Sequence, residues 1–166
     1  MRYEKNTTML VLRVNDYGSI NFIEEHRKEC SKTGSVWMLK IGRALAEKSI
    51  NRVMESGGCL LLKEPKKDGG KYYFCKISDI QQGKAKEEYN YPDYYSQFNP
   101  YGMPLDGTWL KISGIVPLAE TILPQFELVK GGKKMTEIVN STRSPILFVQ
   151  SSISLEEKNG EMWEAK

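Results

Sequence analysis

The segment CLLLKEPKKDGGKYYFCKISDI, residues 59–80, decides the fold because it places two apolar runs around a polar turn. CLLLK (59–63) is short, apolar and uninterrupted, which is typical of a buried strand. EPKKDGGK (64–71) combines Pro, Asp and Gly, the residues that form tight turns. YYFCKISDI (72–80) is rich in aromatic and β-branched residues. We therefore predict a β-hairpin whose first strand is buried.

The residues before this hairpin alternate between strand and helix patterns. Runs of apolar and β-branched residues predict strands, and apolar residues at a spacing of three or four predict helices. Ser19 precedes the first helical pattern as its expected N-cap, and Gly57 and Gly58 follow the second as its stop. The expected order is a strand over 9–14, a helix over 20–30, a strand over 35–41 and a helix over 43–58.

The residues after the hairpin favour further strands. A long polar and aromatic loop is expected over 81–106, and loops of that length inside a compact domain are usually functional or disordered. The patterns then predict a strand over 108–118, a helical turn over 119–123, strands over 126–129 and 146–151, and a short helix over 135–141.

The order of these elements indicates one α+β domain. Its mixed, strongly curved sheet is expected to form a small barrel with the helices packed outside. A length of 166 residues is enough for one domain with a real core. We assign residues 1–151 to this domain and expect residues 152–166 to be a charged tail or the start of a linker.

The composition is that of a folded protein with a mild positive charge. Apolar residues make up 40% of the chain, charged residues 27%, and the formal net charge is +3. That charge permits binding to a polyanion without specifying it. No apolar run approaches the roughly 20 residues that span a bilayer, and the polar N-terminus does not have the pattern of a secretory signal. We expect a cytoplasmic protein with no membrane partner.

The sequence holds few residues of the kinds that catalyse reactions or bind metals. Cys30, Cys59 and Cys75 form no CxxC pair and are expected to be buried reduced thiols. His26 lies in a predicted helix without a partner ligand and is expected at the surface, which argues against zinc sites and histidine-based catalysis. GxSxG, HExxH, P-loop and strand-linked GxGxxG motifs do not occur. We therefore expect no cofactor, no metal and no catalytic activity.

The segment YNYPDYYSQFNPY, residues 89–101, holds six aromatic rings and two prolines. Pro92 and Pro100 restrict the backbone and lower the entropic cost of holding the rings in place. Ring faces suit stacking on a nucleobase, which is worth ~1–3 kcal/mol per base. About half of these rings are expected to pack the loop onto the domain, and one or two to face a ligand. Taken alone, Trp37 and Trp109 fit the core.

Two lysine-rich turns could place positive charge beside these rings. They are KEPKKDGGK (63–71) and KGGKK (130–134). Such runs are usually solvated surface. They would contact phosphates only if both turns lie on the same side of the domain as the rings, because phosphate contacts accompany the base site.

Four motifs follow one another along the chain. They are RVN at 13–15, GSVW at 34–37, GKYYF at 70–74, and LKI at 110–112 followed by VPL at 116–118. Their order and spacing resemble the YTH domain, a family grouped with the EVE domains in the PUA-like superfamily. The resemblance spans residues 8–150. It departs from the family pattern in having tyrosines where the loop usually carries tryptophan, and VKGGKK (129–134) where the family has an Arg-Asp-Gly segment.

The resemblance implies a reader of N6-methyladenine, which YTH domains hold in an aromatic cage. Trp37 would be one wall, a tyrosine of the loop the second, and backbone groups near Ser35 and Met38 would bond the base. Enclosing the methyl group between rings would favour the methylated base by about 1–2 kcal/mol. The residues implied at the base are Asn15, Ser19, Ser35, Trp37, Met38, Tyr91, Tyr94 and Tyr95. Those expected near phosphates are Arg13, Lys40, Lys66, Lys67, Lys130 and Lys133.

We therefore expect a non-catalytic module that flips a modified base into an aromatic cage, with DNA favoured over RNA as its partner. By fold-level analogy, it would be the specificity domain of a McrBC-type modification-dependent restriction system, with an NTPase motor and a nuclease subunit as partners. Three alternatives stay open: an RNA-binding reader, a protein-interaction domain, and a small RNA- or nucleotide-processing enzyme. The enzyme would need an acid/base pair from Asp79, Glu87, Glu88 and Asp93.

Overall fold

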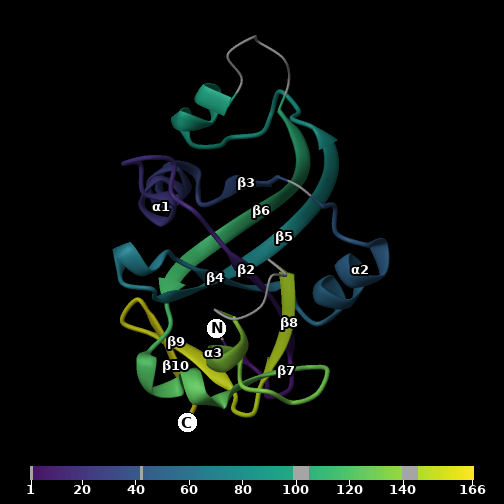
Figure 1. Ribbon diagram of the computed structural model, residues 1–166, viewed down its shortest axis with the longest axis vertical. Coiled ribbons are helices and arrows are strands. Elements are labelled where there is room, and N and C mark those ends of the chain that lie inside the picture. The colour runs from purple at the N-terminus through teal and green to yellow at the C-terminus, as the bar shows by residue number, and fades with distance from the viewer. Residues whose placement is uncertain (1, 42, 99–104, 140–145) are drawn as a thin grey trace.

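The structure is a computed structural model that describes residues 2–41, 43–98, 105–139 and 146–166 (Figure 1). The strands of its large sheet are β2 (Thr8–Arg13), β3 (Val36–Lys40), β4 (Cys59–Lys63), β5 (Tyr72–Lys84), β6 (Asp106–Pro117), β7 (Phe126–Leu128) and β8 (Ile146–Ser151). A small sheet contains β1 (Arg2–Tyr3), β9 (Leu155–Lys158) and β10 (Glu161–Glu164). The α-helices are α1 (Phe22–Thr33), α2 (Glu47–Glu55) and α3 (Met135–Ile138), and the 3₁₀ helices are η1 (Lys66–Asp68), η2 (Asp93–Phe98) and η3 (Glu120–Gln125).

The large sheet is mixed and has the strand order β3-β6-β5-β4-β2-β8-β7, and the small antiparallel sheet has the order β1-β9-β10. The expected α+β class is confirmed. Within the described residues the large sheet is open, with β3 and β7 at its two edges. α1 packs against β3 and β6, and α2 packs against β2 and β5. Figure 1 shows the small sheet and α3 at the opposite end of the molecule from η2.

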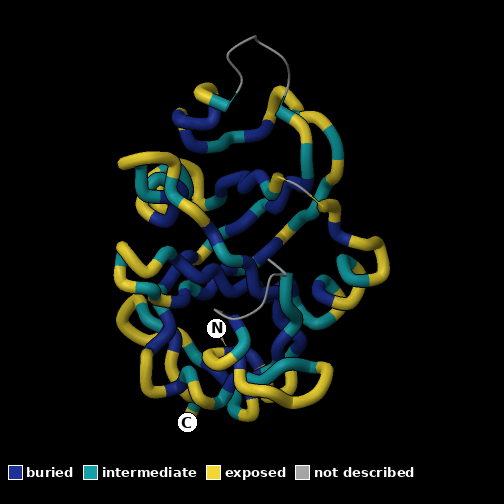
Figure 2. Tube along the Cα trace, in the orientation of Figure 1, coloured by how far each residue is buried: buried dark blue, intermediate teal, exposed yellow. Residues whose placement is uncertain are grey.

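β2 and β4 form the centre of the large sheet and are buried on both faces. They pair in parallel, with Leu10 opposite Leu60. Met9 and Val11 face a core covered by the small sheet, η3 and α3, whereas Leu10 and Leu12 face a core covered by α1 and α2. Figure 2 shows the buried residues running through the middle of the molecule. Because both faces are covered, these strands are apolar without alternation.

β5 and β6 form a long hairpin that bends across the molecule (Figure 1). Register shifts between Phe74 and Lys76 and between Ile77 and Asp79 mark bulges, which bend a strand and increase its twist. The two strands stay paired as far as Lys84 and Asp106. The expected loop over 81–106 is therefore wrong at both ends. Beyond the bulges β5 pairs only with β6 and forms a free edge, whose polar residues hid its strand character.

α1 starts two residues later than expected. Asn21 is its N-cap, because its side chain accepts a hydrogen bond from the Glu24 N–H at 2.9 Å. The assignment of this role to Ser19 is wrong, since Ser19 lies in a tight turn in which Tyr17 and Ile20 exchange backbone hydrogen bonds of 3.1 and 2.9 Å.

Every helix in the described ranges is too short or too polar to cross a membrane.

Residues 155–164 do not form the expected charged tail. They fold into the β9–β10 hairpin, which pairs with β1 at Tyr3 opposite Leu155. Leu155 and Met162 are buried in the core beneath the large sheet, while the charged side chains between them face solvent. The short strands and many charges of this segment hid an alternating pattern that buries only these two side chains.

The three cysteines are free thiols, as expected, with Cys59 and Cys75 buried and Cys30 half-buried. Cys59 faces the core under the small sheet, and Cys75 faces the core under α1 and α2. They therefore lie on opposite faces of the sheet, and burial raises the pKa of the Cys59 thiol to about 11.

α2 ends at the predicted glycine pair in a Schellman motif. The Gly58 N–H donates to the Val53 carbonyl at 2.9 Å, and the Gly57 N–H donates to the Met54 carbonyl at 3.1 Å. Gly58 then lies directly against β5, because its carbonyl accepts from the Ile77 N–H at 2.6 Å. A Cβ atom at Gly58 would lie 2.3 Å from the Ile77 carbonyl oxygen, whereas one at Gly57 would meet nothing within 4 Å.

Gly58→Ala is expected to lower the free energy of unfolding by about 2 kcal/mol more than Gly57→Ala does. Both residues have positive φ, +69° and +112°, so both substitutions share the backbone strain. Only the Gly58 substitution adds the overlap with backbone atoms of β5, and overpacking of this kind costs about 1–3 kcal/mol. Urea unfolding of the two variants measures the difference, and equal midpoints would contradict this close approach.

Candidate functional site

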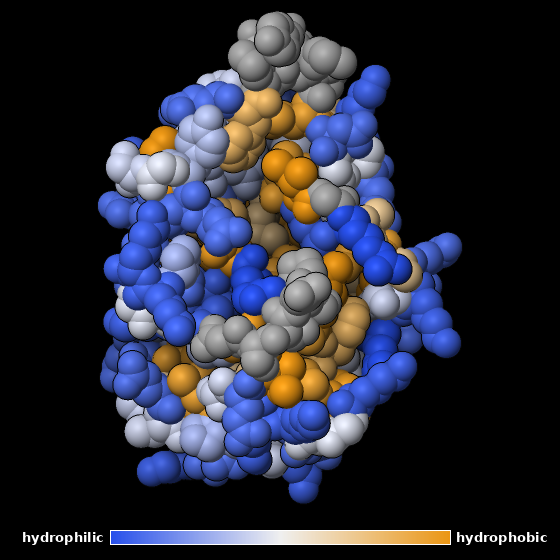
Figure 3. All heavy atoms as spheres, in the orientation of Figure 1, coloured by the Kyte–Doolittle hydropathy of each residue, from blue (hydrophilic) through white to orange (hydrophobic). Residues whose placement is uncertain are grey.

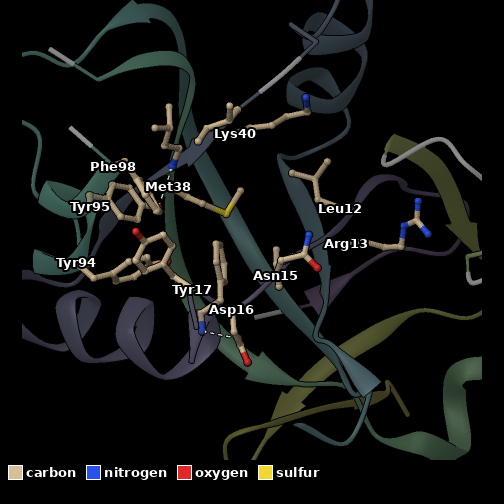
Figure 4. Close-up of a pocket in the computed structure, with 14 residues that line it drawn as sticks. Leu12, Arg13, Asn15, Asp16, Tyr17, Met38, Lys40, Tyr94, Tyr95 and Phe98 are labelled. Carbon is tan, nitrogen blue, oxygen red and sulfur yellow. Dashed lines mark hydrogen bonds between the residues drawn. The ribbon is translucent and has the colours of Figure 1, made fainter. Parts of the chain in front are cut away.

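A cavity of about 380 Å³ opens between the carboxyl end of β2, the free edge of β3, and η2. We call it the β2–β3 pocket (Figure 4). Its volume is in the range of small-molecule sites. The pocket is lined by Leu12, Arg13, Val14, Asn15, Asp16, Tyr17, Phe22, Met38, Leu39, Lys40, Ile41, Tyr94, Tyr95 and Phe98.

The pocket exists because β3 pairs with β6 only. On its free edge the aromatic segment replaces a neighbouring strand: the Trp37 N–H donates to the Asn90 carbonyl at 2.8 Å, and the Leu39 N–H donates to the Tyr95 hydroxyl at 3.1 Å. The segment 89–98 thereby covers the strand edge and closes one side of the cavity. In Figure 4 the rings of this side lie opposite Leu12 and Arg13.

His26 is hydrogen-bonded to Tyr95 and so helps to hold the segment 89–98, the aromatic wall of the pocket, in place. It is 0% exposed, although the sequence analysis placed it at the surface. Its Nδ1 lies 2.7 Å from the Phe22 carbonyl oxygen and its Nε2 lies 2.5 Å from the Tyr95 hydroxyl. Since a carbonyl only accepts, Nδ1 carries the proton and Nε2 accepts from Tyr95. Burial lowers the pKa of His26 to about 4, so the ring is neutral at pH 7.

Two large apolar side chains remain exposed at the mouth of the pocket. Tyr17 is 40% exposed and Ile41 is 65% exposed. Tyr17 precedes Gly18, whose φ of +60° fits the first central position of a two-residue hairpin turn. The ring of Tyr17 is nearly parallel to that of Tyr94, with centroids 6.2 Å apart, and meets Phe98 edge-on at 5.0 Å.

Tyr17 was not predicted as a site residue from the sequence, because it lies in NDYGS, residues 15–19, and this composition is typical of a turn. The signal that could have identified it is a large aromatic ring in a turn between a buried strand and a helix. Nothing in such a turn requires a ring, and an exposed ring beside a cavity suits ligand contact better than folding.

Asp16 is the only carboxylate among the described residues that line the pocket. It accepts from the Phe22 N–H at 2.8 Å and lies 3.5 Å from the Lys67 ammonium nitrogen. Burial acts to raise the pKa of Asp16, but hydrogen bonds from Asp68 and Phe22 and the charge of Lys67 hold it below its usual value. The same hydrogen bond between the two carboxyl groups raises the pKa of Asp68.

The structure brings part of the predicted base site together. The residues predicted at the base or near phosphates that do line the pocket are Arg13, Asn15, Met38, Lys40, Tyr94 and Tyr95. They come from the end of β2, from β3 and from η2, which are far apart in sequence. Lys67 reaches the same region, since it also donates to the Gly18 carbonyl at 3.3 Å.

The assignment of Trp37 as a cage wall is wrong. Trp37 is 6% exposed, lies outside the pocket and stacks on Tyr89, with centroids 3.9 Å apart and planes 17° from parallel. Side chains alternate along β3, so Trp37 and Leu39 point into the aromatic cluster while Val36 and Met38 point into the core under α1 and α2.

Three other predicted base contacts also lie away from the pocket. Tyr91 packs against Tyr95 at 5.3 Å and Trp109 at 5.5 Å. Ser19 is exposed at the turn after Tyr17. The Ser35 carbonyl accepts from the Asn90 side chain at 2.7 Å. None of the three lines the pocket, because each serves the packing or the turns around it.

The predicted phosphate contacts divide between two regions. Lys40 lines the pocket and donates to the Arg43 carbonyl at 2.5 Å, and its burial lowers its pKa. Lys66 is exposed in η1 next to Lys67. Lys130 and Lys133 belong to the turn after β7 and do not line the pocket. The two lysine-rich turns therefore do not both border the pocket.

In comparisons with known proteins, no protein-family model, no curated protein and no solved structure matches this chain.

Proposed function

We propose that this protein is a non-catalytic nucleic-acid-binding module that takes a single extruded base, with N6-methyladenine as the first candidate, into the β2–β3 pocket. The observation that carries the proposal is the exposed ring of Tyr17 at the mouth of a cavity of about 380 Å³. Aromatic side chains and Met38 supply apolar contacts, and Asn15 supplies an amide that can bond the edge of a base.

The proposed fold relationship is to PUA-like domains of the YTH and EVE type. Two bulges bend the β5–β6 hairpin, and a mixed sheet with α1 and α2 on one side is compatible with a small barrel whose closure lies at the pocket. The cage differs from the one that the resemblance implies. In our proposal Tyr17 and the η2 rings take the part assigned to Trp37.

A methylated base gains from this environment. The N6-methyl group adds apolar surface, and its burial against ring faces and the Met38 thioether would contribute about 1 kcal/mol. Flipping a base from a duplex costs a few kcal/mol, which stacking and nearby cations would offset. Lys40, Arg13 and Lys67 are the cations beside the pocket.

A binding module is favoured over an enzyme. The carboxylates that the enzyme alternative requires are Asp79, Glu87, Glu88 and Asp93, and none of them is among the described residues lining the pocket. Asp16, which does line it, is held by the Phe22 N–H and by Lys67. A carboxylate held in this way orients neighbouring groups better than it abstracts protons.

We propose DNA over RNA as the partner and a modification-dependent restriction system of the McrBC type as the setting. In that setting an NTPase motor and a nuclease subunit would act on the DNA that the module selects inside the cell. This step rests on fold-level analogy alone.

Tyr17→Ala is expected to lower the affinity for methylated oligonucleotides about tenfold and to reduce the preference over unmethylated ones. The reason is that stacking on one ring is worth about 1–3 kcal/mol. The measurement is a fluorescence anisotropy titration of matched single- and double-stranded oligonucleotides at two salt concentrations. Trp163→Ala is the control, because Trp163 is 39% exposed but lies on β10. Equal affinities of the two variants for the methylated oligonucleotide, or no binding by the wild type, would contradict the proposal.

A further inference from the structure

A second cavity, of about 430 Å³, lies between α2 and the β7–β8 hairpin. We call it the α2–β8 groove. Its lining consists of Lys48, Ser49, Arg52, Leu128, Val129, Lys130, Ile146, Leu147 and Phe148. The groove thus combines three cations with an apolar floor.

Ile146, Leu147 and Phe148 of β8 line the groove and are all half-buried. Because side chains alternate along a strand, Ile146 and Phe148 form the apolar floor on the side of α2, whereas Leu147 faces the core under the small sheet. β7 pairs with β8 only from Val149 onward, so the start of β8 has β2 on one side and the groove on the other. Figure 3 shows hydrophobic atoms along the centre of this face, with hydrophilic atoms at both margins.

The charges of the groove are of one sign. Lys48 and Arg52 lie one turn apart on α2, a like-charge spacing that weakens a helix, and Lys130 faces them from the turn after β7. Among the described residues no carboxylate lines the groove, and neither Lys48, Arg52 nor Lys130 forms a salt bridge there. A ligand that brings negative charge and a flat apolar part would fit both features.

The groove and the β2–β3 pocket lie next to each other, at neighbouring strands of the large sheet. Leu12 lines the pocket, Ile146 lines the groove, and the two residues are direct partners in the pairing of β2 with β8. Opposite residues in such a pair have Cα atoms about 5 Å apart. A strand of nucleic acid with one base in the pocket would therefore reach the groove with the next nucleotides.

We infer that the α2–β8 groove binds the nucleotides next to the extruded base, with phosphates on Lys48, Arg52 and Lys130 and a neighbouring base or sugar over Ile146 and Phe148. This inference rests on the proposed function of the pocket. It adds a subsite with a distinct role: the pocket selects the modified base, and the groove supplies affinity that is independent of the modification.

The test compares two probes, the nucleoside N6-methyl-2′-deoxyadenosine and a single-stranded DNA pentamer with N6-methyladenine at its centre. Lys48→Gln/Arg52→Gln is expected to weaken pentamer binding about tenfold and to leave nucleoside binding unchanged. Removing two phosphate contacts should make the slope of log affinity against log salt shallower by about 1.4, from roughly 0.7 per contact on single strands. Lys158→Gln/Lys166→Gln, on the small-sheet side, removes the same charge and should match the wild type in both binding and slope.

The outcomes separate the two proposals. If the groove variant binds the pentamer with wild-type affinity and slope while Tyr17→Ala does not, the groove inference is overturned and the pocket stands. If the groove variant loses pentamer binding while Tyr17→Ala keeps it and the nucleoside does not bind, the pocket is overturned and the groove remains a nucleic-acid site. Tighter binding of an acidic pentapeptide than of the pentamer, lost in the groove variant, would overturn the groove as a nucleotide site.

Discussion

Lowering the pH from 7 to 4 is expected to remove about 3 kcal/mol of folding stability through His26 alone. The pKa of His26 falls from the usual 6.5 to about 4 in the folded state, chiefly because the ring is buried. Above pH 6.5 the ring is neutral in both states. Between pH 6.5 and 4 the unfolded chain binds a proton that the folded protein does not, so stability falls by about 1.4 kcal/mol per pH unit.

This loss should be concentrated in the wall of the β2–β3 pocket. A protonated Nε2 can no longer accept the hydrogen bond from Tyr95, whose hydroxyl also accepts from the Leu39 N–H. The contact that holds η2 to the free edge of β3 therefore weakens on acidification. Ligand binding at the pocket should fall with stability in this range.

Urea unfolding of the wild type and His26→Gln at several pH values measures the effect. Gln keeps a polar amide but does not titrate, so carboxylates that titrate in the same range affect both proteins alike. The wild type should be the more stable protein at pH 7, and its advantage should shrink by about 3 kcal/mol by pH 4. Stability curves that stay parallel would show that His26 does not carry this dependence.

The main strands and helices could be predicted from sequence because burial leaves a local pattern. CLLLK matches β4 residue for residue, and the glycine pair after α2 marks its end. The patterns failed where burial involves few side chains. Only Leu155 and Met162 of the last hairpin are buried, and charged residues surround them. The outer half of β5 is an edge that pairs with β6 alone and carries mostly polar residues, so it was mistaken for a loop.

The site was predictable in its parts but not in its assembly. Asn15, Met38 and the tyrosines of η2 line one pocket, as the resemblance implied. The orientation of β3 was not predictable: Trp37 and Met38 are neighbours in a buried strand, and local pattern does not tell which of them faces the pocket. His26 was misjudged for a similar reason, because its partner Tyr95 lies 69 residues away.

Trp109→Ala is expected to have the largest effect on stability, lowering the free energy of unfolding by about 3–5 kcal/mol. The side chain is fully buried, and its Nε1–H donates to the Gly83 carbonyl at 3.1 Å. Its ring lies 5.4 Å from Tyr89, 5.5 Å from Tyr91 and 6.3 Å from Tyr95. Removing it leaves a large cavity between β6 and the aromatic segment, and collapse of that segment would disturb the pocket wall.

Thermal unfolding tests this prediction against Trp163→Ala, which removes the same side chain from the exposed face of β10. We expect the melting temperature to fall by on the order of 10 °C for Trp109→Ala and by only a few degrees for Trp163→Ala. Below its melting temperature, Trp109→Ala should also bind the pentamer more weakly than Trp163→Ala does, because Tyr94 and Tyr95 depend on the cluster that it anchors. A small stability loss, comparable with that of Trp163→Ala, would mean that the aromatic segment holds its place without Trp109. The wall of the pocket would then depend on the His26–Tyr95–Leu39 hydrogen bonds instead.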